Sequence, residues 1–381
     1  MYDTFYIMKK FVFDSLVDEE NFCNFKKERE LLLKYIEQQA NVVLYAPRNY
    51  GKTSLIKNLI YKDFKQRNKK SFFLYVDLIE VKSRESMEDR IIKAFEHYFS
   101  LAFPVKKLVD EVKSQVLGLK PDFSLDPVTG NITIKINPKS NNNPQSLADI
   151  FAAISNISQK IPTLLVFDEF QDIALLDEAQ GIFRSLLESV NKTATIVLGS
   201  KQHMLADIFS NPKAPLAMWG KDVSLPPIDY ERYLQYILER FKVKNILIDL
   251  KEAVYLQDIM HRIPEAINIL CQQILDDCEG LTVTENIVNS ALLNLLEQKQ
   301  SRYENYLAHF SINEEKLFVV LSRNNITTNP QGKELVKQLQ LTHRTIGSLM
   351  QKNIKAGIIE NIENGYRLSD PLFSCYLKKY R

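Results

Sequence analysis

The chain has 381 residues, of which 45% are hydrophobic and 25% are charged, as in an ordinary folded protein long enough for two or three domains. Its 49 basic and 47 acidic residues leave a net charge of +2, which excludes a polycation that binds nucleic acid along its whole length. The sequence also shows no secretion signal and no apolar run near the roughly 18 residues of a membrane span.

The cysteines are too scattered to indicate a metal site, because none stands in a C-x-x-C pair. They are Cys23, Cys271, Cys278 and Cys375. We therefore expect a cytoplasmic protein with no zinc and no membrane partner.

The first predicted elements are an amphipathic helix from Phe22 to Ile36 and a buried strand from Val42 to Tyr45. A tight turn follows the strand and opens into a helix that we expect to run to Asn68. This layout points backbone N–H groups and a helix N-terminus at one place, which suits a nucleotide polyphosphate. The expected cradle consists of Ala46, Pro47, Arg48, Asn49, Tyr50, Gly51, Lys52, Thr53 and Ser54.

Three residues of this turn match the phosphate-binding pattern G-x-x-x-x-G-K-[ST], although Ala46 replaces its first glycine. Gly51 lets the backbone approach a phosphate, Lys52 brings a charge to the β and γ oxygens, and the Thr53 hydroxyl can bind Mg²⁺. A chance Gly-Lys-Thr at a helix start is the alternative. The preceding strand and the apolar helix face after the turn argue against it.

A second parallel strand is predicted from Ser71 to Asp77, and a helix from Ser86 to Phe103. Apolar and polar residues then alternate from Asp122 to Ile136 around a Pro/Gly turn, which predicts a β-hairpin inserted at about residues 105–145. The polar run from Asn137 to Gln145 leads to a helix that begins near Ser146.

The strand from Thr163 to Phe167 ends in two acids, at the sheet edge where ligands of open α/β folds bind. Asp168 is placed to hold Mg²⁺, and Glu169 to orient and deprotonate an attacking water. The alternative is an acidic pair that caps the next helix. The order and spacing of the two motifs favour nucleotide binding and hydrolysis.

The next predicted helix runs from about Asp177 to Asn191, and the next strand ends at Ser200, our candidate for sensing the γ-phosphate or the lytic water. A plain turn serine is the alternative. Lys201 and His203 follow, and both suit solvated positions at a helix start better than nucleotide contacts.

A short strand from Lys221 to Leu225 completes an α/β core with a mainly parallel sheet, and two prolines then mark a domain edge. Helical patterns continue from Asp229 to about Glu297. There Pro264 either leans on the bound nucleotide or serves only as the first residue of a helix. We predict an ATPase core over residues 1–228, a helical lid over 229–300 and a third domain over 301–381.

The third domain has the layout of a winged helix-turn-helix: helices from Lys333 to Leu339 and from Thr342 to Lys355 precede a hairpin with an Asn-Gly turn. Residues 301–381 contain twelve Lys or Arg and seven Asp or Glu, which favours an anionic partner. Protein contact or internal packing is an equal alternative to DNA. The side chains suited to DNA are His343, Arg344, Thr345, Ser348, Gln351 and Lys352.

Four segments together resemble the archaeal-type P-loop ATPases, which are grouped with the STAND and AAA+ ATPases. They are A-P-R-N-Y-G-K-T-S-L at Ala46–Leu55, V-F-D-E-F-Q at Val166–Gln171, L-G-S-K at Leu198–Lys201 and Y-R-L-S-D-P-L-F at Tyr366–Phe373. The resemblance extends from about Phe22 to the C-terminus. It implies a P-loop NTPase core, a helical lid and a winged helix, with ATP and Mg²⁺ as cofactors.

The resemblance further implies a nucleotide-controlled switch that binds and hydrolyses ATP. Its possible binding partners are duplex DNA, a protein or a second copy of itself. The family often lacks the first glycine of the loop, so Ala46 is compatible with function. Phe25, Asn49 and Lys221 stand where arginines are common, which predicts slow hydrolysis. A slow ATP-binding scaffold for signalling or defence, with protein contacts through the hairpin and winged helix, is the alternative.

Overall fold

The computed structural model describes residues 11–103, 122–125, 132–135, 145–176, 178–278, 282–324, 326–329, 332–362 and 364–381. Two compact units are present. One comprises Phe25–Arg48 and Lys52–Pro226, and we call it the core unit. The other, the helical unit, comprises Met1–Asn24, Asn49–Gly51 and Pro227–Arg381, so the boundary falls between the two adjacent prolines.

The core unit is built on a five-stranded parallel sheet with the order β2-β5-β6-β1-β7. Its three central strands are almost wholly buried, because helices cover both faces of the sheet. This confirms the predicted α/β fold with a parallel sheet. The strands are β1 (Asn41–Tyr45), β2 (Phe72–Asp77), β5 (Thr163–Asp168), β6 (Thr193–Gly199) and β7 (Lys221–Ser224).

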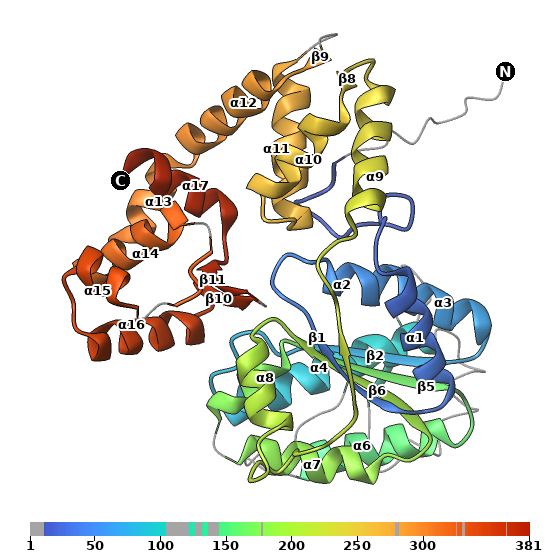
Figure 1. The fold of residues 1–381 in the computed structure, drawn as a ribbon. Helices are drawn as coiled ribbons and strands as arrows, with labels where there is room; N and C mark the ends of the chain where they lie inside the picture. The colour runs from blue at the N-terminus through green and yellow to red at the C-terminus, as the bar shows by residue number, and fades with distance from the viewer. Residues whose placement is uncertain are drawn as a thin grey trace, which may run out of the picture. The chain divides into compact units, whose positions relative to one another are not determined.

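Helix α1 and a continuous helical stretch after the phosphate-binding turn lie on one face of the sheet, and four helices lie on the other (Figure 1). A core of aromatic and aliphatic side chains fills the second interface, where Phe167 meets Phe183 edge-on. The first layer contains α1 (Lys26–Glu37), α2 (Lys52–Ser54), the π-helical η1 (Leu55–Ile60) and α3 (Tyr61–Arg67). The second contains α4 (Arg84–Ala102), α6 (Gln145–Ser158), α7 (Ala179–Ser189) and α8 (Gln202–Phe209).

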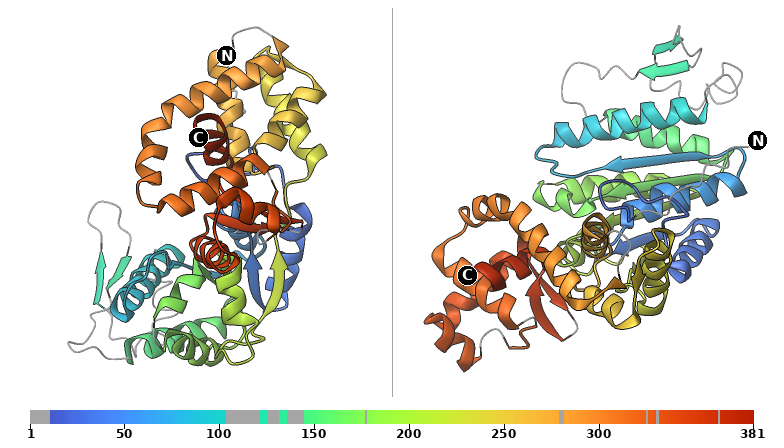
Figure 2. Two further views of the ribbon diagram at one scale, coloured as in Figure 1. Left: turned by 60° about the vertical axis from the view of Figure 1, so that its left-hand side comes forward. Right: turned by 90° about the horizontal axis from the view of Figure 1, so that it is seen from above.

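The predicted hairpin is present as the antiparallel strands β3 (Asp122–Leu125) and β4 (Ile132–Lys135), which lie beside α4 (Figure 2). The polar run predicted from Asn137 lies outside the described residues up to position 144. A short 3-10 helix, η3 (Phe170–Leu175), directly follows the acidic strand, and the sequence pattern gave no indication of it.

In the helical unit, the predicted lid residues form four helices and a two-strand parallel pair. A polar network joins the N-terminal segment to the lid: Asn268 donates to the Val12 carbonyl at 2.7 Å, and Arg240 donates to Asn21 Oδ1 at 2.8 Å. The elements are α9 (Tyr230–Val243), β8 (Leu247–Ile248), α10 (Leu250–Ile259), α11 (Pro264–Asp277), β9 (Thr282–Val283) and α12 (Glu285–Gln298).

The last part of the helical unit has the element order of a winged helix-turn-helix, as the sequence predicted. Thr342 caps the second helix of the motif through its bond to the Thr345 amide, and the following strands pair antiparallel. The elements are α13 (Gln300–Leu307), α14 (Ile312–Asn324), α15 (Lys333–Leu339), α16 (His343–Lys355), β10 (Ile359–Ile362), β11 (Gly365–Leu368) and α17 (Pro371–Tyr380).

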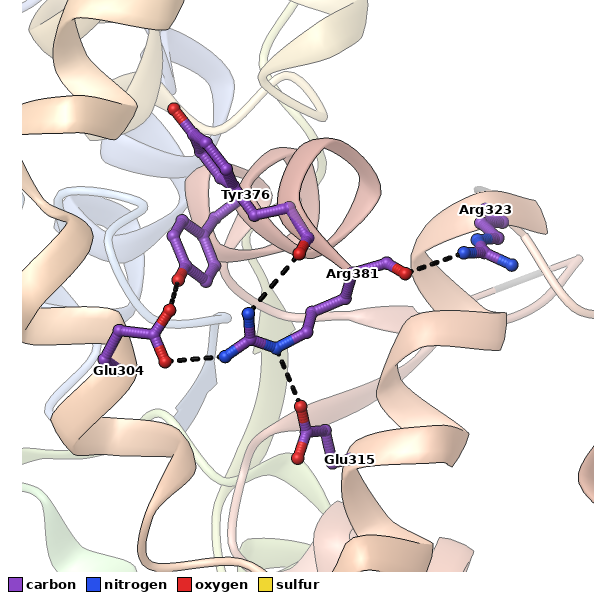
Figure 3. Close-up of polar contacts among 6 residues, drawn as sticks. Glu304, Glu315, Arg323, Tyr376 and Arg381 are labelled. Carbon is purple, nitrogen blue, oxygen red and sulfur yellow. Dashed lines mark hydrogen bonds and ion pairs between the residues drawn. The ribbon is translucent and has the colours of Figure 1, made fainter.

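Arg381 joins three helices of this region, as Figure 3 shows. Its guanidinium donates to Glu304 Oε2 at 2.6 Å and to Glu315 Oε1 at 2.8 Å, while its carbonyl accepts from Arg323. Tyr376 of α17 also donates to Glu304. These contacts fasten α17 against α13 and α14.

Candidate functional site

The phosphate-binding turn lies between β1 and α2, at the carboxyl edge of the sheet. Asn49 and Gly51 have φ angles of 65° and 81°, in the left-handed region that Asn and Gly tolerate best. Lys52 is buried, and its Nζ lies 3.4 Å from the Ala46 carbonyl oxygen and 3.3 Å from that of Pro47. The turn therefore encloses its own lysine, with the ammonium directed across the loop.

The charge of Lys52 is balanced by the two acids at the end of β5. Burial lowers the pKa of Lys52 below its usual value, Glu169 and Asp168 oppose that change, and Arg48 adds to it. An anion bound in the turn would stabilise the charged lysine. This electrostatic setting suits a phosphate.

Asp168 and Thr53 are brought together from distant parts of the chain. The Thr53 hydroxyl donates to Asp168 Oδ2 at 3.1 Å, so the acidic strand meets the first turn of the helix after the loop. One hydroxyl and one carboxylate beside a phosphate site match the way Mg²⁺ is usually held in nucleotide-binding proteins. Within the described part of the chain, no group of three or more His, Cys, Asp or Glu side chains offers a separate metal site.

Tyr75 is a further contact of Asp168 that the sequence pattern did not reveal. It lies on β2, the strand paired with β5, and its hydroxyl donates to the same Oδ2. Burial raises the pKa of Asp168, whereas the Tyr75 hydrogen bond lowers it. The negative charge of Glu169 raises the same pKa, and the positive charge of Lys52 lowers it. Tyr75 thus favours the ionised carboxylate that a cation needs.

Glu169 begins the turn after β5 with a φ of 49°, which is uncommon for a residue other than glycine. The Ser200 hydroxyl donates to Glu169 Oε2 at 3.0 Å. The predicted catalytic carboxylate, Glu169, and the predicted sensor, Ser200, are therefore in direct contact. Gln171 also donates to Oε2, at 2.6 Å, although the sequence had suggested no role for it.

The residues next to Ser200 have other contacts. Lys201 Nζ lies 3.5 Å from Asp172 Oδ1, which is an ion pair beside the site. The side chain of His203 lies outside the described residues. Arg184 pairs with Glu188 on the same helix and donates to the Pro215 carbonyl, in keeping with a surface position.

Pro264 is the first residue of α11, with Ile263 as the capping residue. Its carbonyl accepts from the Tyr233 hydroxyl at 3.2 Å. Arg262 stacks its guanidinium 4.1 Å above the Tyr230 ring and donates to the Ile228 carbonyl. These contacts fix the start of α11 within the helical unit. Contact of Pro264 with a nucleotide stays a prediction.

Most of the residues predicted to contact DNA are exposed on α16, and one has an internal partner. Lys352 Nζ lies 2.8 Å from Oε1 of the buried Glu314. Thr345 is half-buried, with its hydroxyl 2.9 Å from that of Thr342. The exposed members are His343, Arg344, Ser348, Gln351 and Lys352.

The chain has the α/β fold of AAA+ type P-loop NTPases, and several solved structures share this fold. A Walker-type ATPase of Pyrococcus abyssi aligns over 97% of this chain and 99% of its own, with a TM-score of 0.67 and 15% identity. The ORC2 protein of Aeropyrum pernix, solved as ADPNP–ADP complexes, aligns over 94% of each chain with a TM-score of 0.55 and 13% identity.

The ORC1 protein of Aeropyrum pernix, solved in complex with DNA, covers 97% of this chain and 95% of its own, with a TM-score of 0.50 and 12% identity. No protein-family model matches the chain, and no curated protein matches it. No described helix is both long and apolar enough to span a membrane.

Proposed function

We propose that this protein binds ATP with Mg²⁺ and hydrolyses it slowly, as a nucleotide-controlled switch. The observation that supports this function most strongly is the convergence of Lys52, the Thr53–Asp168 pair and the Ser200–Glu169 pair. They come from the ends of two neighbouring strands, β5 and β6, and from the helix after the turn. Such a set of groups is needed for in-line transfer of a phosphoryl group to water.

Each group has a separate task in binding. The backbone N–H groups of the turn and the Lys52 ammonium face the β and γ phosphates, where the lysine supplies compact positive charge. Thr53 and Asp168 would hold Mg²⁺, which supplies further charge neutralisation when bound. The buried position of Lys52 strengthens its attraction to an anion, because little water competes there.

Glu169 and Ser200 act on the water. As the water oxygen bonds to the γ phosphorus and the bond from phosphorus to the β–γ bridging oxygen breaks, Glu169 accepts a water proton and ADP leaves. Ser200 holds the carboxylate in place. General-base assistance of this kind typically contributes about 10² to 10⁴ in rate.

We further propose that the nucleotide state controls DNA binding through α16. The exposed Arg344, Ser348 and Gln351 support this proposal, as does the excess of basic residues after position 300. A relative of similar fold was solved with DNA. The ion pair between Lys352 and Glu314 favours the alternative of a protein-binding scaffold. It engages the Lys352 ammonium, which was expected to contact a DNA phosphate.

Equilibrium binding of a fluorescent ATP analogue tests the nucleotide site. We expect Lys52→Ala to weaken binding about 10- to 100-fold, because a hydrogen-bonded charge is removed from the phosphates. Lys65→Ala, at a half-buried position of α3, serves as the control and should bind as the wild type does. Equal affinity of the wild type and Lys52→Ala would contradict the proposed site.

A further inference from the structure

Gln171 occupies an unusual position beside Glu169, the proposed general base. It is the second residue of η3, two positions after Glu169, and only 1% of its surface is exposed. Its Nε2 donates to Glu169 Oε2 at 2.6 Å and lies 3.2 Å from Asp172 Oδ1. An amide nitrogen facing two carboxylates fixes the orientation of the side chain, because the amide oxygen would be repelled there.

The other end of the same amide confirms that its placement is specific. Gln171 Oε1 is buried and has no hydrogen-bond partner within the described residues, an arrangement that opposes stability. The oxygen fits only because residue 199 is glycine: a Cβ there would lie 1.9 Å from it. The sheet edge thus leaves space for a side chain whose polar contacts, among the described residues, are with the acids.

The two donors to Glu169 reach the same oxygen. Gln171 and Ser200 both donate to Oε2, whereas no described residue donates to Oε1. Oε2 is therefore anchored and Oε1 is left to accept a proton. Asp172 in turn holds Gln171, and is itself held by the Glu80 amide at 2.8 Å and by Lys201.

We propose that Gln171 is a positioning residue for hydrolysis, which together with Ser200 anchors Oε2 of Glu169 so that Oε1 faces the attacking water. This inference rests on the proposed ATPase function. A carboxylate held by two donors cannot rotate away from the water.

The variant Gln171→Met tests this role, since methionine has a similar length and lacks the amide. We expect kcat to fall roughly 10- to 100-fold, because a small displacement of the Glu169 carboxylate has an effect of this size. The Kd for ATP should stay within twofold of the wild type. Gln180→Met, which removes another amide with a buried unpartnered oxygen, is the matched control.

Combining Gln171→Met with Glu169→Gln separates positioning from a structural effect. We expect Gln171→Met to cause no further loss of rate in the Glu169→Gln background, because it acts through that carboxylate. Equal hydrolysis by Gln171→Met and the wild type, or an equal loss in both backgrounds, would overturn the role of Gln171 alone. Absence of hydrolysis by the wild type would instead overturn the ATPase proposal.

Discussion

At the scale of single residues, Asp168 is the point where the nucleotide motifs meet. It accepts hydrogen bonds from Thr53, from Tyr75 and from the Glu169 amide, and only 3% of its surface is exposed. A buried carboxylate needs such donors to remain ionised. We therefore expect any cation binding by Asp168 to depend on Tyr75, a residue outside both sequence motifs.

We predict that Tyr75→Phe raises the Mg²⁺ concentration for half-maximal ATP hydrolysis by roughly threefold to tenfold, the effect of losing one hydrogen bond. Loss of the Tyr75 hydroxyl raises the pKa of Asp168 further, so protons compete better with the cation for this carboxylate. The increase in the Mg²⁺ requirement should therefore be larger at pH 6 than at pH 8. Tyr98→Phe, on α4 of the same unit, is the control. An unchanged Mg²⁺ requirement at both pH values would show that Tyr75 does not support the site.

The sequence predicted the residues that meet at the candidate site but missed two of their hydrogen-bond partners. Lys52, Thr53, Asp168 and Glu169 could be predicted because their roles follow from fixed spacing at strand ends. Tyr75 could not, because its contact depends on β2 pairing with β5, and strand order is not encoded in local periodicity. Gln171 stood in a quoted motif, but its role depends on the turn of Glu169 and on the space at Gly199.

At the scale of elements, α16 is fastened to α14 by Glu314. This carboxylate accepts from Lys352 at 2.8 Å, from the Ser311 amide at 3.0 Å and from Asn353 at 3.2 Å. Burial alone would raise the pKa of Glu314, but the Lys352, Ser311 and Asn353 donors outweigh it and lower the pKa to about 2. The buried carboxylate of Glu314 thus holds α16, the helix expected to contact DNA, against α14.

We predict that Glu314→Gln lowers the free energy of unfolding by about 1 to 3 kcal/mol at pH 7, the value of hydrogen bonds to a charged group. Since the folded pKa is depressed, this stability is present above the ordinary pKa of 4.5 and is lost as the pH falls towards 2. The difference from the wild type should therefore shrink across that range. Urea unfolding followed by circular dichroism measures it, with Glu334→Gln on the exposed side of α15 as control. A difference independent of pH would contradict the role of the charge.

For DNA, we predict that Arg344→Ala weakens binding to a short duplex and lowers the salt slope by about one, because one phosphate contact is lost. Lys352→Ala should have a smaller effect, since its ammonium already pairs with Glu314. Lys379→Ala on α17 is the control. Fluorescence anisotropy over a range of salt concentrations measures all four proteins. No binding by the wild type at low salt would favour the scaffold alternative.

At the scale of the whole molecule, the sequence predicted the kind and order of most elements. The parallel sheet, the inserted hairpin and the winged helix order follow from periodicity and turn residues, which are local properties. The short helix η3 was missed because Phe170 and Ile173 are buried by tertiary packing in a segment too short to show a period.

The central claim is that the chain hydrolyses ATP with Glu169 as the base, and steady-state release of phosphate by the wild type and Glu169→Gln tests it most directly. Glu178→Gln changes another glutamate with a left-handed backbone and serves as the control. We predict slow, Mg²⁺-dependent turnover by the wild type and the control, and a loss of about 10² to 10⁴ in Glu169→Gln with ATP binding retained. Tight ATP binding without turnover by the wild type would contradict the claim and favour a nucleotide-binding scaffold.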